Sequence, residues 1–118
     1  MTKVMLVDDD QTMVSLMQTL LELDGYEVVT ARTGTEVVAK AEAERPQIMM
    51  IDFHLTDMEG VEVVRELRAH PVFANLPILM ASGLDVREEV MAAGANEFIV
   101  KPFDPGDLPI IFNRLLGS

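Results

Sequence analysis

The chain has 118 residues, of which 49% are hydrophobic and 25% are charged, which indicates one soluble globular domain over residues 1–118 and excludes a disordered chain. Acidic residues outnumber basic ones 20 to 9 and give a formal net charge of −11, so the protein repels phosphate backbones and anionic lipid, and we expect neither nucleic acid nor a membrane surface among its partners. The absence of cysteine excludes disulfide scaffolds, thiolate metal sites and cysteine nucleophiles.

The first predicted element is a strand at residues 4–7, since an unbroken apolar run of this length is typical of central parallel strands covered on both faces. Asp10 is the predicted N-cap of the helix that follows. That helix ends before Gly25, a frequent C-terminal stop, and its predicted buried face consists of Met13, Leu16, Met17, Leu20 and Leu21. Residues 26–30 mix polar and β-branched side chains, which predicts a strand nearer an edge of the sheet.

The alternation of helix and strand continues through the middle of the chain. A second helix, marked by apolar positions 37, 38 and 41, ends before Pro46. The apolar run 48–51 predicts a third strand, positions 61, 64 and 67 mark a third helix, and the run 78–81 predicts a fourth strand.

The last three elements are a short helix over residues 86–91 that stops near Gly94, a strand at residues 98–100 and a final helix. Asp107 is the predicted N-cap of the final helix, with Pro109 in its first turn and an apolar face formed by Leu108, Ile111, Phe112 and Leu115. Five strands that alternate with helices predict an α/β fold with parallel strands and right-handed crossovers.

Polar residues follow the apolar strands and would gather at one edge of such a sheet, where doubly wound folds bind ligands: Asp8, Asp9, Asp10, Asp52, Ser82 and Lys101. Clustered carboxylates need either a proton or a cation. Because the chain has no cysteine and only two histidines, His54 and His70, oxygen ligands predominate and favour a hard divalent cation such as Mg²⁺. Lys101 and Ser82 are suited to contact a phosphoryl group at the same edge.

Together these residues resemble the receiver domain of two-component response regulators, and the resemblance extends from residue 3 to residue 116. The matching pieces are the acidic pair in VDDD, the aspartate in MMIDFHL, the hydroxyl in ILMASG, the lysine in FIVKPF, Gly60, and the turn Gly94-Ala95. The resemblance implies a five-stranded parallel doubly wound sheet in the flavodoxin-like order 2-1-3-4-5.

The resemblance also implies the chemistry of the site. Asp52 corresponds to the carboxylate that accepts a phosphoryl group from a histidine kinase or a histidine phosphotransfer protein. Asp8 and Asp9 would bind Mg²⁺ together with Asp52 and the backbone carbonyl of His54. The domain itself would be a phosphoacceptor and not an enzyme, apart from its own phosphorylation and dephosphorylation.

Further residues acquire roles through the same resemblance. Ser82, Lys101 and the backbone N–H of Gly83 would contact the phosphoryl oxygens. Ser82 and Phe98 would form a switch in which the ring turns inward as the hydroxyl moves toward the phosphoryl group. The Lys101–Pro102 peptide bond is expected to be cis.

The sequence departs from the family pattern at a few places. The segment from Ser82 to Gly94 is shorter than usual by nearly one helical turn, which predicts a shortened fourth helix. Thr56 stands where many members have proline. His54 and Leu84 flank the phosphoryl group, and Leu84 is expected to exclude water, which predicts slow self-dephosphorylation.

Two alternatives remain open at this point. Residues 6–12, LVDDDQT, also fit the motif of haloacid-dehalogenase-like phosphatases with Asp8 as nucleophile, although that interpretation gives no role to Asp52. A degenerate receiver that only binds proteins is the second.

The expected partners are the phosphodonor and a downstream protein target or output domain outside this chain. A homodimer through the last two helices and strand is also considered. The sequence ends at Ser118, directly after the last predicted helix, so the chain is either a stand-alone receiver or a part of a longer regulator. With no predicted membrane span and no secretory signal, we expect a cytoplasmic protein.

Overall fold

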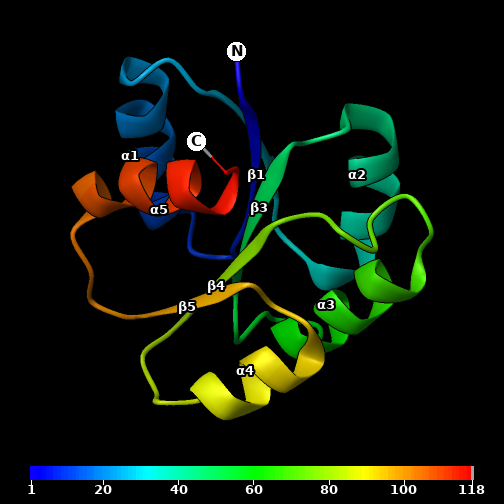
Figure 1. Ribbon diagram of the computed structural model, residues 1–118. Helices are drawn as coiled ribbons and strands as arrows, with labels where there is room; N and C mark the ends of the chain where they lie inside the picture. Colours follow the sequence, from blue (N-terminus) through cyan, green and yellow to red (C-terminus); the bar gives the residue numbers. More distant parts are fainter. Residues whose placement is uncertain (118) are drawn as a thin grey trace.

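The computed structural model describes residues 1–117 and shows five parallel strands in one sheet (Figure 1). Ser118, the last residue of the predicted domain, lies outside the described residues. The strand order β2-β1-β3-β4-β5 confirms the predicted order. The strands are β1 (Lys3–Val7), β2 (Glu27–Ala31), β3 (Ile48–Asp52), β4 (Ile78–Ser82) and β5 (Glu97–Val100).

Helices cover both faces of the sheet, with α1 and α5 on one side and α2 and α3 on the other (Figure 1). The α-helices are α1 (Gln11–Leu23), α2 (Val37–Glu44), α3 (Gly60–Ala69), α4 (Arg87–Ala93) and α5 (Leu108–Leu115). Short 3₁₀ turns, η1 (Gly34–Glu36) and η2 (Pro105–Asp107), precede α2 and α5. With seven residues, α4 is the shortest α-helix in residues 1–117, as expected for the short helix predicted before Gly94. None of the helices in this part of the chain is long and apolar enough to cross a bilayer.

The two-sided covering explains the unbroken apolar runs. Successive side chains of a strand point to opposite faces, and in β1 Met5 and Val7 pack into the core under α2 and α3, while Val4 and Leu6 pack into the core under α1 and α5. All four are at most 1% exposed. A strand of this kind has no solvent-facing side and therefore shows no polar alternation.

β5 is an edge strand, as the predicted strand order requires, although its apolar run 98–100 resembles those of the central strands. Val100 at the end of this run is 48% exposed. Only Phe98 is fully packed, at 4% exposure. A run of three apolar residues is too short to distinguish an edge strand from a central one. The polar, β-branched run at the other edge became β2, as predicted.

The first helix buries a narrower face than predicted. Val14, Met17 and Leu21 are its buried residues, whereas Leu16 is 50% exposed and Leu20 is 38% exposed. The expectation that Leu16 and Leu20 lie in the core is wrong, because one row of residues spaced by three and four fills the contact with the sheet. The apolar face of α1 is therefore wider than the part of it that the sheet and α5 cover.

Helix ends follow local chemistry in most places. Asp10 is the N-cap of α1 and its side chain accepts from Met13 N at 3.2 Å, as predicted. Asp107 occupies the N-cap position of α5 without a capping bond, which corrects its predicted role. Asp104 instead caps the preceding turn by accepting from Gly106 N at 2.9 Å, because η2 starts the helical path three residues earlier.

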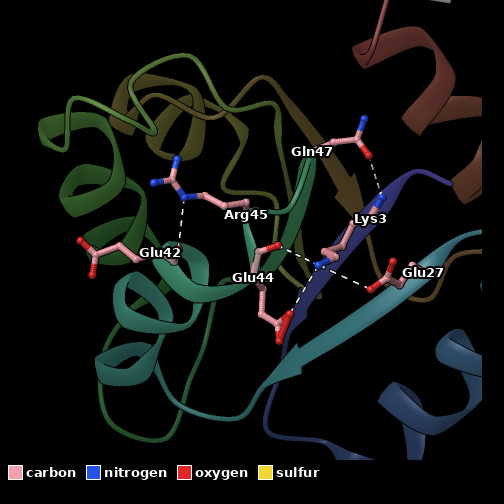
Figure 2. Close-up of polar contacts among 6 residues, drawn as sticks. All are labelled: Lys3, Glu27, Glu42, Glu44, Arg45 and Gln47. Carbon is pink, nitrogen blue, oxygen red and sulfur yellow. Dashed lines mark hydrogen bonds and ion pairs between the residues drawn. The ribbon is translucent and has the colours of Figure 1, made fainter.

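Lys3, the first residue of β1, contacts residues of α2 and β2 (Figure 2). Its Nζ donates to the Glu44 carbonyl at 2.9 Å and lies 3.4 Å from carboxylate oxygens of Glu44 and Glu27. Its backbone N–H donates to Gln47 Oε1 at 3.0 Å. The lysine thereby fixes the end of α2 against β1 and β2.

We expect Lys3→Met to lower the free energy of unfolding by about 1 kcal/mol, the typical net contribution of one well-formed hydrogen bond plus partly exposed ion pairs. Urea unfolding measures this loss. Arg65→Met is the matched control, because Arg65 is exposed and its side chain makes no hydrogen bond or ion pair within residues 1–117. Equal effects of both substitutions would show that the Lys3 contacts are not stabilising.

Candidate functional site

Three carboxylates meet at the carboxyl edge of the sheet because β1 and β3 are neighbours. Val7 pairs with Ile51 in register, so the residues after them, Asp8 and Asp52, lie side by side. Asp8, Asp9 and Asp52 each offer a carboxylate oxygen, and these atoms lie within 4.8 Å of one another. The clustering predicted from the strand ends is therefore present.

Lys101 links two of these carboxylates from the end of β5. Its Nζ lies 2.6 Å from Asp52 Oδ1 and 3.5 Å from Asp8 Oδ2. The backbone of Lys101 donates to the Ser82 carbonyl at 2.8 Å, and the Lys101–Pro102 peptide bond is cis. Burial alone would lower the pKa of Lys101, but the hydrogen bond and charge of Asp52, together with Asp8, outweigh burial and raise the pKa above its usual value. The ammonium therefore stays charged beside the carboxylates.

Asp8 is the most buried carboxylate of the cluster. The residue is 5% exposed, and burial raises the pKa of its carboxyl group above the usual value. The nearby charges of Asp52 and Asp9 act in the same direction, whereas the hydrogen bond from Asp10 N, at 2.9 Å, and the charge of Lys101 act against it. A carboxylate in this environment is stabilised by any additional positive charge.

The donor set fits a hard divalent cation. The ligand atoms are carboxylate oxygens, and no other group of three or more acidic, histidine or cysteine side chains in residues 1–117 comes together in this way. Mg²⁺ typically takes one or two carboxylates, keeps several waters and binds phosphate oxygens. The His54 side chain belongs to a different contact, with Nδ1 lying 3.3 Å from Glu59 Oε2.

Ser82 and Gly83 lie at the end of β4, beside the carboxylates. Ser82 is 1% exposed, and its Oγ accepts from Leu84 N at 3.1 Å. A hydroxyl that accepts one bond still has its own hydrogen to donate. Gly83 is exposed, and Leu84 is 57% exposed, so the leucine forms no buried cover over the site in this structure.

Phe98 lies on β5 with its side chain packed into the same core cluster as Val90 and Ala93 of α4, the helix that contacts β5. It pairs in register with Met80 and is 4% exposed. The Arg87 guanidinium lies 5.6 Å from the ring centroid and donates to the Phe98 carbonyl at 3.3 Å. The ring is therefore in an inward position, and Arg87 was not anticipated as its neighbour.

The loop after Asp52 contains contacts that the sequence did not reveal. Asp57 accepts from Gly34 N at 2.8 Å and from Thr35 N at 3.0 Å, which fixes the loop to the segment after β2. Thr56 donates its hydroxyl hydrogen to Asp9. A threonine and an aspartate in a polar loop are compatible with many partners, so no sequence signal identifies these contacts.

The chain matches known proteins over nearly its whole length. The family model described as "Response regulator receiver domain" matches residues 4–113. Among curated relatives, the alkaline phosphatase synthesis transcriptional regulatory protein PhoP of Bacillus subtilis is 37% identical over 109 residues, which cover 90% of this chain and 45% of PhoP. The transcriptional regulatory protein PrrA of Mycobacterium tuberculosis is 36% identical over 115 residues, covering 97% of this chain and 49% of PrrA. The chain thus spans about half the length of these relatives.

Solved structures show the same architecture. The chemotaxis protein CheY4 of Vibrio cholerae superposes with a TM-score of 0.91 and 34% identity, over 98% of both chains. The receiver domain of a sensor histidine kinase from Pseudomonas aeruginosa, solved with a magnesium ion coordinated in its active-site cleft, superposes with a TM-score of 0.84 and 30% identity, over 99% of this chain and 98% of that one. The sheet order, the aspartate cluster at its carboxyl edge and the match over residues 4–113 lead to one conclusion: the chain belongs to the response regulator receiver domain family, a family of signalling domains.

Proposed function

We propose that the chain forms one receiver domain in which Asp52 accepts a phosphoryl group in a Mg²⁺-dependent reaction. The donor is a histidine kinase or a histidine phosphotransfer protein, and phosphorylation changes the affinity for a downstream protein or an output domain. The observation that carries the proposal is the position of Lys101, whose Nζ lies 2.6 Å from Asp52 Oδ1 and 3.5 Å from Asp8 Oδ2. This places a fixed positive charge where a phosphoryl group on Asp52 would add negative charge.

The transfer is a substitution at phosphorus. A carboxylate oxygen of Asp52 forms a bond to phosphorus while the bond from phosphorus to the donor's histidine nitrogen breaks, and the electron pair of that bond stays on the imidazole. Mg²⁺, held by Asp8, Asp9, Asp52 and the backbone carbonyl of His54, would supply positive charge beside the transferring group. Lys101 orients Asp52 through their hydrogen bond.

The phosphoryl oxygens on Asp52 would be bound by groups from β4 and β5. The Ser82 hydroxyl, the backbone N–H of Gly83 and the Lys101 ammonium lie at the same sheet edge as Asp52. Movement of Ser82 toward the phosphoryl group, which would hold the already buried Phe98 ring in its inward position, is the proposed switch. Such a change shifts a population between two packing states, which alters a protein-binding surface.

The family also defines the proposed cellular setting. Receiver domains act between a phosphodonor protein and an output, so we place the chain in the cytoplasm, with protein partners. The net charge of −11 opposes direct contact with nucleic acid. We also propose that two copies pair through α4, β5 and α5.

Mass spectrometry after incubation with acetyl phosphate tests the proposed function. We expect one phosphoryl addition to the wild-type protein in Mg²⁺, and none without Mg²⁺ or in Asp52→Asn, because the amide is not a nucleophile. In this reaction the bond from phosphorus to the acetyl oxygen breaks and acetate leaves.

Two results would contradict the proposal. Failure of the wild type to gain a phosphoryl group under any condition would identify a degenerate receiver that only binds proteins. Addition that persists in Asp52→Asn but disappears in Asp8→Asn would favour the phosphatase-like chemistry at Asp8.

A further inference from the structure

Asp9 differs from the other two carboxylates of the cluster because it is exposed. Asp8 is buried and accepts from Asp10 N, and Asp52 is held by Lys101. Within residues 1–117, the one hydrogen bond to the Asp9 side chain comes from Thr56, whose Oγ1 donates to Asp9 Oδ2. An exposed aspartate without a partner samples several rotamers, and this freedom is lost when the carboxylate becomes a ligand.

Thr56 is well placed to restrict that freedom because its own position is fixed. Its side chain is β-branched and stiff at χ1. The preceding residue, Leu55, donates its N–H to the Met58 carbonyl at 3.2 Å, which closes a tight turn. The following residue, Asp57, accepts from the backbone of Gly34 and Thr35. The turn and the Asp57 contacts together hold the Thr56 hydroxyl against Asp9.

We propose that Thr56 is a positioning residue for the cation site, and that its hydroxyl holds Asp9 in the orientation in which the carboxylate joins Asp8 and Asp52. This inference rests on the proposed function, in which the three carboxylates bind Mg²⁺. A carboxylate has two oxygens, so Oδ2 keeps the hydroxyl bond while Oδ1 stays free for the cation. A proline at position 56, as in many receivers, has no hydroxyl and makes no such bond.

The Mg²⁺ dissociation constant of the unphosphorylated protein, measured by isothermal titration calorimetry, tests the inference. Thr56→Val keeps the shape of the side chain and removes the donor, and we expect it to weaken Mg²⁺ binding about 10-fold, the lower range for groups that orient a metal ligand. Thr56→Ser keeps the donor and should bind as the wild type does. Thr19→Val is the matched control, because Thr19 donates to the Ser15 carbonyl at 3.0 Å on the exposed side of α1.

The Mg²⁺ dependence of phosphorylation by acetyl phosphate gives a second readout. In Thr56→Val, the Mg²⁺ concentration for half-maximal rate should rise by the same factor as the dissociation constant. The maximal rate at saturating Mg²⁺ should remain that of the wild type, since Thr56 acts through Asp9 and not on the phosphoryl group. A general disturbance of the loop would lower the maximal rate as well and would overturn the inference.

The outcomes separate this inference from the function on which it rests. Wild-type Mg²⁺ affinity in Thr56→Val would overturn the role of Thr56 and leave the proposed function intact. If Thr56→Ser bound Mg²⁺ as weakly as Thr56→Val does, the role of the Thr56 hydroxyl would also be overturned, because the shape of the side chain and not its hydroxyl would then determine the affinity. If the wild type itself bound no Mg²⁺, both the inference and the proposed Mg²⁺-dependent transfer would fail.

Discussion

Gly60→Ala is expected to destabilise the protein by about 3 kcal/mol, the upper range for forcing an extra methyl group into a packed region. A Cβ at position 60 would lie 2.7 Å from Met80 Cε and 3.1 Å from Phe53 Cα, and it would collide with the carbonyl oxygen of Asp52. The backbone cannot retreat easily, because Gly60 N donates to the Phe53 carbonyl at 2.6 Å. The residue that must move is therefore the proposed phosphoacceptor, so phosphorylation by acetyl phosphate should also slow.

Gly83→Ala provides the matched control on the other side of the site. A Cβ at Gly83 would meet no atom within 4 Å, and the backbone there is not in the left-handed region. The substitution also retains the backbone N–H that we assign to phosphoryl binding. Urea unfolding should show a change within about 0.5 kcal/mol for Gly83→Ala, as for ordinary surface substitutions. Similar losses of unfolding free energy in Gly60→Ala and Gly83→Ala would contradict the role of close packing at Gly60.

Asp8→Asn is expected to stabilise the magnesium-free protein by about 1–2 kcal/mol at neutral pH, as estimated from like charges a few ångströms apart at a partly desolvated site. Burial, followed by the charges of Asp52 and Asp9, raises the pKa of Asp8 even though Asp10 and Lys101 oppose the shift. Asparagine retains an oxygen that accepts from Asp10 N and removes the repelled charge. The wild type thus keeps a charge that is useful for cation binding at a cost in stability.

The direction of the pH dependence follows from the sign of this shift. The pKa of Asp8 in the folded protein lies above the value of 3.8 that the carboxyl group has without the fold, so the folded state binds the proton more tightly than the unfolded state does. Protonation of the Asp8 carboxyl group therefore stabilises the folded state at low pH. This contribution to the free energy of unfolding is lost as the pH rises from about 3.8 through the raised pKa. The advantage of Asp8→Asn should be small near pH 3.8 and complete at neutral pH.

Urea unfolding with a chelator at several pH values measures the effect of Asp8→Asn. Asp85→Asn, which alters an exposed loop residue, is the control and should change stability by less than about 0.5 kcal/mol. Addition of Mg²⁺ should stabilise the wild type more than Asp8→Asn, because a ligand that binds the folded state stabilises it by mass action. A neutral-pH stability of Asp8→Asn below that of the wild type would show that the negative charge of Asp8 is not repelled.

The sequence predicted the features that depend on local pattern and on the geometry of parallel sheets. Unbroken apolar runs became β1, β3 and β4, and the run of polar and β-branched residues became the edge strand β2. The clustering of Asp8 and Asp52 followed from two strand ends that meet at one edge. These predictions succeeded because parallel strands place all their carboxyl ends on the same side.

The wrong predictions concern burial, which depends on how much of a helix or strand the neighbouring layer covers. Leu16 and Leu20 have the spacing of a buried face, yet only Val14, Met17 and Leu21 are buried in α1. Val100 ends an apolar run like those of the central strands, but it is exposed because it lies on an edge strand, as the predicted strand order requires. Periodicity identifies a helix or a strand, whereas the width of the contact with the next layer is set by packing.

By itself, the sequence determined the order of elements, the parallel sheet and the set of acidic residues at its carboxyl edge, because each of these depends on residue type and short spacing. The tertiary structure alone decided the contacts across the site: Lys101 reaches Asp52 over 49 positions of the chain, and Thr56 reaches Asp9 over 47. Such pairs form only after crossover helices have brought distant loops together, and no local pattern encodes which loop side chains then meet. The residues that carry the proposed chemistry are thus visible in the sequence, while the partners that orient them follow from the fold.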